Sequence, residues 1–298
     1  MGVRPRTVFI HGSAGDRRAS QEGYAYFPTI SLDSKRIYYR ILKSGTGPFL
    51  GASELWVADI ESGRNELLLP GFAVTGYNIS RDGRRIVFSA LDSDRRPRLW
   101  LGSTDRTEPP RQIANVEGDM PSFGPPGELV FHAIKGNATF AFRVREDGTN
   151  KQRLTQKDVQ ELYGTSPDGK FLIAKTEVRG ELGTGACVAV PVDGSPLIPI
   201  FDGLCVLKWQ PNGRFVYVSV YTAQMSAGAA GRTYVLPVPP GKVFPYIPPG
   251  GFHSEAEIAA LPGVRVIDAA DVSPSPLPDV YAFSRQDVYR NLHRIPLP

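Results

Sequence analysis

Short alternating strands separated by tight polar turns are the pattern that this chain repeats. In YGTSPDGKFLIAKT, residues 163–176, one apolar stretch leads into Ser-Pro-Asp-Gly and another leaves it. Pro presets φ at the second turn position, Asp bonds its own backbone, and Gly accepts a positive φ, so this tetrapeptide closes a β-hairpin. The pattern predicts two strands joined by a turn.

The same turn recurs at nearly regular spacing. It has five forms, which are SLDSKRIYYR from Ser31, SRDGRRIVFS from Ser80, GPPGELVFHA from Gly124, SPDGKFLIAK from Ser166 and QPNGRFVYVS from Gln210. The third turn residues are 49, 44, 42 and 44 residues apart, at Asp33, Asp82, Pro126, Asp168 and Asn212. A period of about 40–50 residues with several strands per repeat predicts the blades of a β-propeller.

Each repeat continues with a third and a fourth apolar stretch. Third strands are expected in SELWVADIESG, PRLWLGST, AFRVREDG, CVAVPVDG and TYVLPVPPG, and short fourth strands in RNELLLP, PRQIA, KQRLT and LIPIF. Asp-Gly or Ser-Gly turns separate several of these pairs. Four strands per unit with such turns are typical of a propeller blade.

These residues carry a family resemblance over about residues 24–298. The S-P-D-G turn, the LWVAD-type strand and the DGTNKQRLT ending resemble the TolB-like, or WD-like, β-propeller repeat. The resemblance implies a fold found in bacterial Tol-type periplasmic proteins and in the propeller domains of receptor-like serine/threonine kinases, and it implies little about function. The sequence departs from the repeat where Ser34 replaces the turn Gly and where Pro126 and Asn212 replace the turn Asp.

The fifth repeat is longer than the others, and the chain ends complement each other. A short helix is expected at 254–261, with Ser254 as N-cap, Glu257 at the capping-box spacing and Pro262-Gly263 as the stop. DVYAFSRQDVYRNLHRIPLP predicts two last strands, and RTVFIHG from Arg6 is an orphan strand. We expect the N-terminal strand to join the C-terminal blade and close the ring. The prediction is an all-β, six-bladed propeller of four-stranded antiparallel blades, forming one domain over residues 1–298.

Composition and charge narrow the classes of function. The 298 residues include 34 basic and 30 acidic side chains, with the basic ones scattered, so no nucleic-acid partner is expected. No apolar run approaches the roughly 18 residues that span a bilayer, so no membrane insertion is expected. The resemblance implies a periplasmic or extracytoplasmic location as part of a longer protein. A cytoplasmic location stays open because no signal peptide is present.

No catalytic or metal-binding pattern is present in the sequence. The histidines, at positions 11, 132, 253 and 293, lie in different repeats without a neighbouring ligand at metal-binding spacing. Cys187 and Cys205 fit no zinc ribbon, and we expect a reduced structural pair, with a disulfide as the open alternative. We therefore predict no cofactor, no metal and no catalytic residue.

Two surfaces are candidate binding sites. The innermost strands place a small or polar set beside the central channel, namely Thr29, Asn78, Ser122, Gly164 and Lys208. Such a wall suits a small molecule or a peptide end, and water is the alternative occupant. The second-to-third loops are long, as binding loops often are, and two of them carry Arg96 and Arg179, which suit an acidic partner or a carboxylate. A solvated surface is the alternative for these arginines.

The leading hypothesis is a non-enzymatic, monomeric propeller that binds a protein, peptide or small ligand at the long-loop face, around the channel mouth. It serves as a sensor or interaction domain of an exported bacterial protein. The alternative is a lyase or hydrolase acting on a polysaccharide or peptide there, because a propeller can assemble a site from single residues on different blades. A purely structural spacer is the third hypothesis.

Overall fold

The computed structural model describes residues 6–21, 23–42, 52–156, 158–176, 185–221, 231–277 and 279–286. Apart from one short helix, the regular elements in these ranges are β-strands, as the sequence predicts. Within the described ranges, no helix is long and apolar enough to cross a membrane.

Antiparallel sheets of four strands are the building unit. Three of them follow chain order: β11 (Asp119–Phe123), β12 (Glu128–Lys135), β13 (Ala138–Arg145) and β14 (Gln152–Arg153); β15 (Val159–Thr165), β16 (Phe171–Thr176), β17 (Ala186–Pro191) and β18 (Ile198–Phe201); and β19 (Cys205–Trp209), β20 (Phe215–Tyr221), β21 (Gly231–Pro237) and β22 (Arg265–Ile267). Each of these sets matches one repeat of the sequence.

Two further sets pair into one larger sheet. They are β3 (Ala25–Ile30), β4 (Arg36–Leu42), β5 (Ser53–Asp59) and β6 (Asn65–Leu67), and β7 (Val74–Ile79), β8 (Arg85–Leu91), β9 (Pro97–Ser103) and β10 (Arg111–Glu117). A single residue pair, Ser53 with Val74, joins β5 to β7. The two sets are therefore separate four-stranded units that touch at one point.

The remaining sheet combines both ends of the described chain. Its order is β2 (Gly15–Arg18), β1 (Arg6–Gly12), β24 (Tyr281–Gln286) and β23 (Ser273–Pro274). The sequence predicts two strands in 279–298 and one at the N-terminus. In 279–298 the described residues form one strand, β24, and the second predicted strand is not tested. The N-terminal stretch supplies two strands instead of one, and the inner strand is Ser273–Pro274, which lacks the apolar alternation used to find strands. Residues 287–298 lie outside the described residues.

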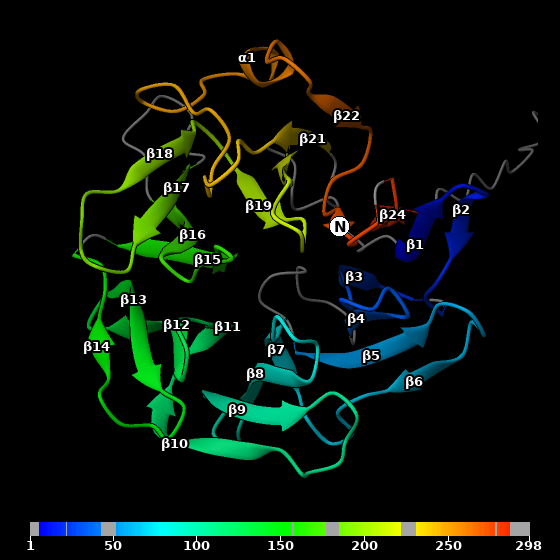
Figure 1. The fold of residues 1–298 in the computed structure, drawn as a ribbon. Coiled ribbons are helices and arrows are strands. Elements are labelled where there is room, and N and C mark those ends of the chain that lie inside the picture. The colour runs from blue at the N-terminus through cyan, green and yellow to red at the C-terminus, as the bar shows by residue number, and fades with distance from the viewer. Residues whose placement is uncertain are drawn as a thin grey trace, which may run out of the picture.

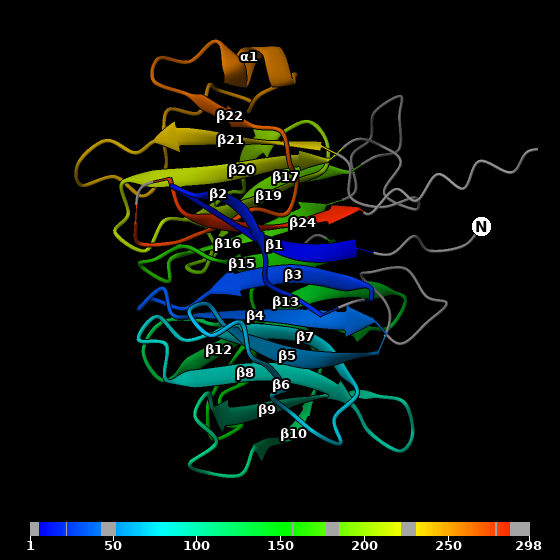
Figure 2. The same cartoon turned by 90° about the vertical axis from the view of Figure 1, so that its right-hand side faces the viewer.

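The sheets are arranged around a common centre, with the first strand of each repeat innermost (Figure 1). In the view turned by 90°, the strands run across the molecule from one face to the other (Figure 2). Apolar clusters fill the spaces between neighbouring sheets. In β4, for example, Ile37 and Tyr39 face the β1–β24 side, whereas Tyr38 faces β7 and β8. Because successive side chains point to opposite faces and both faces are covered, these strands are apolar at nearly every position.

The insertion in the fifth repeat lies at the outer rim. The short helix α1 (Glu255–Ala259) begins at the N-cap Ser254, whose Oγ accepts the Glu257 backbone N–H at 3.3 Å, as predicted. The Glu257 carboxylate in turn accepts the His253 N–H at 2.9 Å. Phe252 and the buried Ile258 pack into the core cluster between the sheet of β15–β18 and the sheet of β19–β22, so the insertion covers the outer edge (Figure 1).

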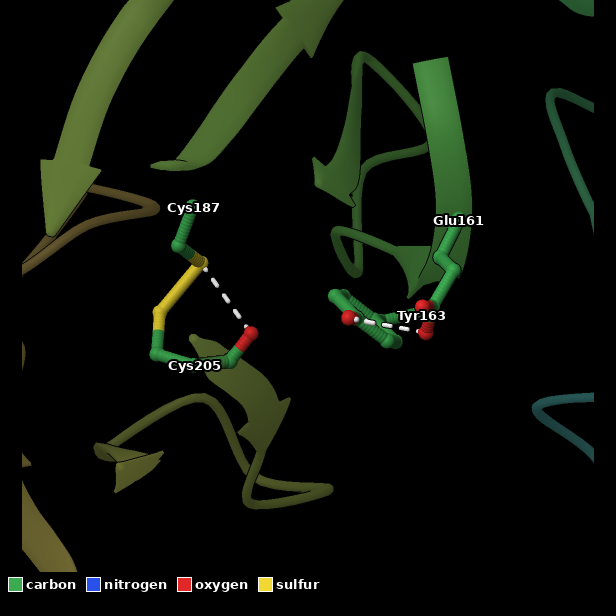
Figure 3. The surroundings of a disulfide bond; sticks show 4 residues. All are labelled: Glu161, Tyr163, Cys187 and Cys205. Atoms are coloured by element: carbon green, nitrogen blue, oxygen red, sulfur yellow. Dashed lines mark hydrogen bonds between the residues drawn. A yellow bond between two sulfur atoms is a disulfide. The ribbon is translucent and has the colours of Figure 1, made fainter. Parts of the chain in front are cut away.

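The two cysteines form a disulfide, and the expectation of a reduced pair is wrong. Cys187 on β17 and Cys205 on β19 are both buried, and their Cα atoms are 5.5 Å apart (Figure 3). That separation is within the usual range of about 4.4–6.8 Å for disulfides. The cysteines are in different repeats, so only the packing of two sheets brings them together. The bond links neighbouring sheets next to Tyr163, which packs against the same cluster.

The turns explain one testable feature of stability. Gly83 takes a φ of 73° in its turn, and Ser34 takes 57° at the equivalent position. A residue with a Cβ is strained there by about 1 kcal/mol relative to Gly. Ser34→Gly should therefore raise the free energy of unfolding by about 1 kcal/mol in urea denaturation. Gly83→Ser should lower it similarly, because a Cβ at Gly83 meets no other atom within 4 Å. A change of the same sign in the free energy of unfolding of both variants would refute this explanation.

The disulfide should contribute measurably to stability. The bond closes a loop between residues 18 apart, and the entropy lost by the unfolded chain corresponds to about 3 kcal/mol. Cys187→Ala/Cys205→Ala should lower the free energy of unfolding by at least that amount in urea. A reducing agent should lower the melting temperature of the unmodified chain and leave that of the double variant unchanged. A reductant effect of the same size on both would contradict the assignment.

Candidate functional site

A central cavity of about 420 Å³ lies between the innermost strands. Its wall is built from β3, β7, β11, β15, β19 and β23, with Arg40 from β4 and Tyr221 from β20. Cavities of roughly 300–1,000 Å³ are typical of small-molecule sites. The cavity therefore has the size of a ligand site and is walled by segments from every sheet.

The polar residues predicted to face the channel all line this cavity. They are Thr29, Asn78, Ser122, Gly164 and Lys208. Several also tie neighbouring sheets together. Thr29 Oγ1 accepts the Tyr77 hydroxyl at 3.2 Å, and Asn78 Oδ1 lies 3.4 Å from the Phe123 N–H that it accepts. Ser122 Oγ is 3.5 Å from Thr165 Oγ1. The wall thus carries several polar groups, and contacts between sheets hold them in place.

Asp271 is the central polar residue of the wall, and it is not among the residues predicted from the sequence. Its side chain is only 4% exposed and connects three sheets. Oδ2 accepts the Phe27 N–H at 2.9 Å and the Ser284 hydroxyl at 3.4 Å, while Oδ1 is 3.1 Å from Lys208 Nζ. The only sequence signal was its place in DAADVSPSP, which lies outside the repeating turns.

Residues with unusual backbone angles lie on or beside the inner strands. Phe27, Met120 and Asp271 have φ values of 55°, 49° and 57°, in the left-handed region that bulky residues avoid. The register of β3 shifts between Tyr26 and Thr29, at Phe27. Hydrogen bonds hold this geometry, since Phe27 donates to Asp271 and its carbonyl accepts the Tyr77 hydroxyl at 2.6 Å. Strain of this kind is concentrated at functional sites.

The cavity contains phenols that stay protonated and an arginine that stays charged. Burial raises the pKa of Tyr77, of Tyr163 and of Tyr221. Burial lowers the pKa of Arg40 to about 10, and the nearby Asp119 carboxylate opposes that shift. At neutral pH these tyrosines therefore act as hydrogen-bond donors, and Arg40 is a cation held by Ser53 Oγ at 2.6 Å.

The cavity reaches the face formed by the short turns. Leu32, Arg81, Pro167 and Pro211, which all belong to first-to-second turns, line it. The sequence analysis placed the site on the opposite, long-loop face because long loops often bind ligands. The cavity thus extends to the short turns, where the innermost strands end. Much of the long loops, at 43–51, 177–184 and 222–230, lies outside the described residues, so a site on that face stays a prediction.

The loop arginines lie apart from the cavity. Arg96 is exposed and forms a 3.6 Å ion pair with Glu117, while its neighbour Arg98 donates from Nε to Asp92 at 2.8 Å. Acidic groups of the same sheet thus already compensate part of this charge. Arg179 lies outside the described residues. The structure therefore brings Thr29, Asn78, Ser122 and Lys208 together and leaves Arg96 on a separate surface.

The histidines within the described ranges are also separate from one another. His11 stacks on Tyr281 and bonds Asp16 at 2.7 Å, and His253 lies 3.7 Å from Asp202. Burial lowers the pKa of His132, so this ring is neutral at pH 7. No group of three or more His, Cys, Asp or Glu side chains within the described ranges is arranged to hold a metal ion.

Solved structures share this fold. A protein of Agrobacterium tumefaciens assigned to TolB superposes with a TM-score of 0.66 at 17% identity, covering 97% of this chain and 100% of the other. TolB from Acinetobacter baumannii gives 0.55 at 15% identity, covering 78% of this chain and 61% of the other. An oligogalacturonate lyase from Vibrio parahaemolyticus gives 0.50 at 13% identity, covering 74% of this chain and 65% of the other.

No protein-family model and no curated protein matches the chain. At these identities the likeness concerns the fold, which is a TolB-like β-propeller, as the repeated turns predict.

The pair of Asp271 and Lys208 allows a direct test of the wall. Asp271→Asn keeps a residue that tolerates a positive φ but removes the charge opposite Lys208. The free energy of unfolding should fall by about 2–4 kcal/mol, because Lys208 loses its counter-charge and the single amide oxygen can replace only one of the two carboxylate oxygens that accept from Lys208 and from the Phe27 N–H. Adding Lys208→Met should recover part of this loss in urea denaturation.

The control for this pair is Asp268→Asn. Asp268 is 94% exposed and lies 3.6 Å from Arg232. This change should cost less than about 0.5 kcal/mol. Equal losses for Asp268→Asn and Asp271→Asn would show that the buried pair has no special role in the wall.

Proposed function

We propose that this chain is a six-bladed propeller closed by its N-terminal strands, and that it acts as a binding module with its ligand in the central cavity. The pairing of β1 with β24 and the repeated four-stranded sheets support the closed ring. The observation that carries the binding role is the cavity of about 420 Å³, which every sheet helps to line. A sensor or interaction domain is expected to have such an arrangement, in which rigid sheets surround one binding cavity.

The wall suits recognition because its polar groups are positioned in advance. Lys208, Asn78 and Thr29 are fixed by neighbouring sheets, so a ligand does not have to order them on binding. Such preorganisation favours affinity because less entropy is lost. The aromatic faces of Phe27, Trp209 and Tyr163, which also line the cavity, supply apolar contact area.

Binding is favoured over catalysis by the state of the side chains. A lyase or hydrolase needs a group that takes or gives a proton near neutral pH. The buried tyrosines of the wall have raised pKa values, and Asp271 already accepts three hydrogen bonds. These groups hold a ligand in place better than they transfer its protons.

The disulfide supports an oxidising compartment outside the cytosol. Disulfides persist in the periplasm and in extracellular space and are rare where glutathione and thioredoxin keep thiols reduced. The buried bond between Cys187 and Cys205 is therefore consistent with the sensor domain of an exported protein.

A thermal-shift screen tests the binding role. A compound that binds only the folded chain raises its melting temperature, by an amount equivalent to about 2.7 kcal/mol at a hundred times its Kd. The screen should contain sugars, short peptides, small acids and peptidoglycan fragments. At least one class should raise the melting temperature, and Asn78→Trp, which places a large side chain on the cavity wall, should abolish the shift.

Arg96→Ala is the matched control, because Arg96 lies on the long-loop face. Hits should bind this variant normally. A shift that survives Asn78→Trp but disappears in Arg96→Ala would overturn the cavity site and favour a partner on the long loops. A screen without hits against a well-folded chain would overturn the small-ligand role.

A further inference from the structure

The charges of the cavity wall are unbalanced. Three cationic side chains, Arg40, Arg81 and Lys208, line the cavity, and Asp271 is the single carboxylate among the described lining residues. Asp119 lies near Arg40 but outside the lining. In a channel with walls of low dielectric, an excess of one sign focuses the field and attracts ligands of the opposite sign. The imbalance favours an anionic ligand.

We propose that the cavity takes a carboxylate and that Lys208 is its anchor. The carboxylate belongs either to a small free acid or to the C-terminal end of a peptide, since both present the same group. This inference rests on the proposed binding role of the cavity and specifies the class of ligand.

Lys208 has one donor to spare for such a ligand. A lysine ammonium has three N–H donors. Within the described part of the chain, Nζ lies 3.1 Å from Asp271 Oδ1 and 3.5 Å from the Pro28 carbonyl oxygen. These two acceptors come from other sheets and fix the ammonium at the wall. Since the side chain is 26% exposed and lines the cavity, the third N–H is available to a bound carboxylate.

The negative charge of Asp271 does not prevent an anionic ligand from binding at Lys208. Its oxygens accept from Lys208, from the Phe27 N–H and from Ser284, so its charge is compensated within the wall. Asp271 thereby holds Lys208 rather than repelling an incoming anion. The buried carboxylate thus holds the Lys208 ammonium at the wall through an ion pair.

Gln210 supplies a second polar contact. It is 2% exposed, lines the cavity and donates from Nε2 to the Ser275 carbonyl at 3.2 Å. Its Oε1 is buried without a hydrogen-bond partner among the described residues. Gln210 follows the last residue of β19 directly, two positions beyond Lys208, and both residues line the cavity. A ligand that places a hydroxyl or amide N–H on Gln210 and a carboxylate on Lys208 satisfies both groups.

Arg81 favours approach from the short-turn face. It lies in the turn after β7, lines the cavity and donates from Nη1 to the Pro167 carbonyl at 3.3 Å. Leu32, Pro167 and Pro211 form an apolar margin beside it. An acid with an apolar or peptide-like body can therefore enter with its carboxylate leading.

Isothermal titration with two matched pairs of probes tests the inference. N-acetyl-trialanine is compared with its C-terminal amide, and glucuronate with glucose, so each pair differs in the charged group. One of the acids should bind, and its neutral counterpart should bind roughly 10- to 100-fold more weakly, the range expected for one charge-assisted hydrogen bond. Binding confined to the peptide acid identifies a peptide end, and binding confined to glucuronate identifies a small acid.

Variants separate the anchor from the fold. Lys208→Met should weaken binding of the acid by the same factor, and Lys208→Arg should retain most of it. Because Lys208→Met leaves Asp271 without its cation, Lys208→Met/Asp271→Asn serves as a charge-balanced variant that should fold and still fail to bind the acid. Lys135→Met, which removes an exposed lysine at the end of β12, should bind like the unmodified chain.

Equal binding of acid and amide, or unchanged binding by Lys208→Met, overturns the carboxylate assignment. Absence of binding by both acids also overturns it. In either case the proposed binding role still stands if a neutral compound from the thermal-shift screen binds and Asn78→Trp abolishes that binding. The two proposals therefore fail by different results.

Discussion

The antiparallel pairing of β1 with β24 is the constraint on which the rest of this structure depends. It runs from Arg6 opposite Gln286 to His11 opposite Tyr281 and joins the two ends of the described chain. This pairing positions β23 beside β3, where Ser273 Oγ accepts the Ile30 N–H at 3.2 Å. It also brings Asp271 to Phe27, which is 244 residues away in the chain. Without the pairing of the ends, the cavity would lack one side and Lys208 would lack its carboxylate.

Contacts between inner strands pass from sheet to sheet around the cavity. Tyr77 bonds the carbonyl of Phe27, Thr165 Oγ1 donates to the carbonyl of Phe123 at 2.8 Å, and Gln210 reaches Ser275. Between the sheets that begin with β15 and β19, the Cys187–Cys205 disulfide makes a covalent link. The apolar clusters hold the sheets together by burying apolar surface, an interaction that imposes no specific geometry. The hydrogen bonds and the disulfide have defined lengths and angles, so they restrict how the sheets are positioned relative to one another. The same bonds that order the frame therefore shape the wall.

The sequence predicted the features that are local and repeated. The S-P-D-G turns, the four strands that follow most of them and the cap at Ser254 depend on residues a few positions apart, so propensity and spacing identify them. Thr29, Asn78, Ser122 and Lys208 were located on the wall for the same reason, because each stands two residues before a recognisable turn. Asp271 and the disulfide were missed because both depend on contacts between different repeats. β23 contains only Ser273 and Pro274, and two residues are too few to show alternation. The site on the long-loop face stays a prediction, because residues 43–51, 177–184 and 222–230 of those loops lie outside the described residues.

The pair of Lys208 and Asp271 is expected to add little net stability, and the proposed binding role offers a second reason for it. Burying two charges costs several kcal/mol per ion, and their attraction only partly offsets this, so apolar residues of similar volume often give an equally stable fold. Most positions on these strands are apolar, which shows that the frame accepts such residues. Asp271 nevertheless keeps a left-handed backbone, with φ at 57°, and three donors converge on its carboxylate. An arrangement this costly is expected where it orients a charge toward a ligand, and the ammonium it orients lines a cavity to which every sheet of the described residues contributes.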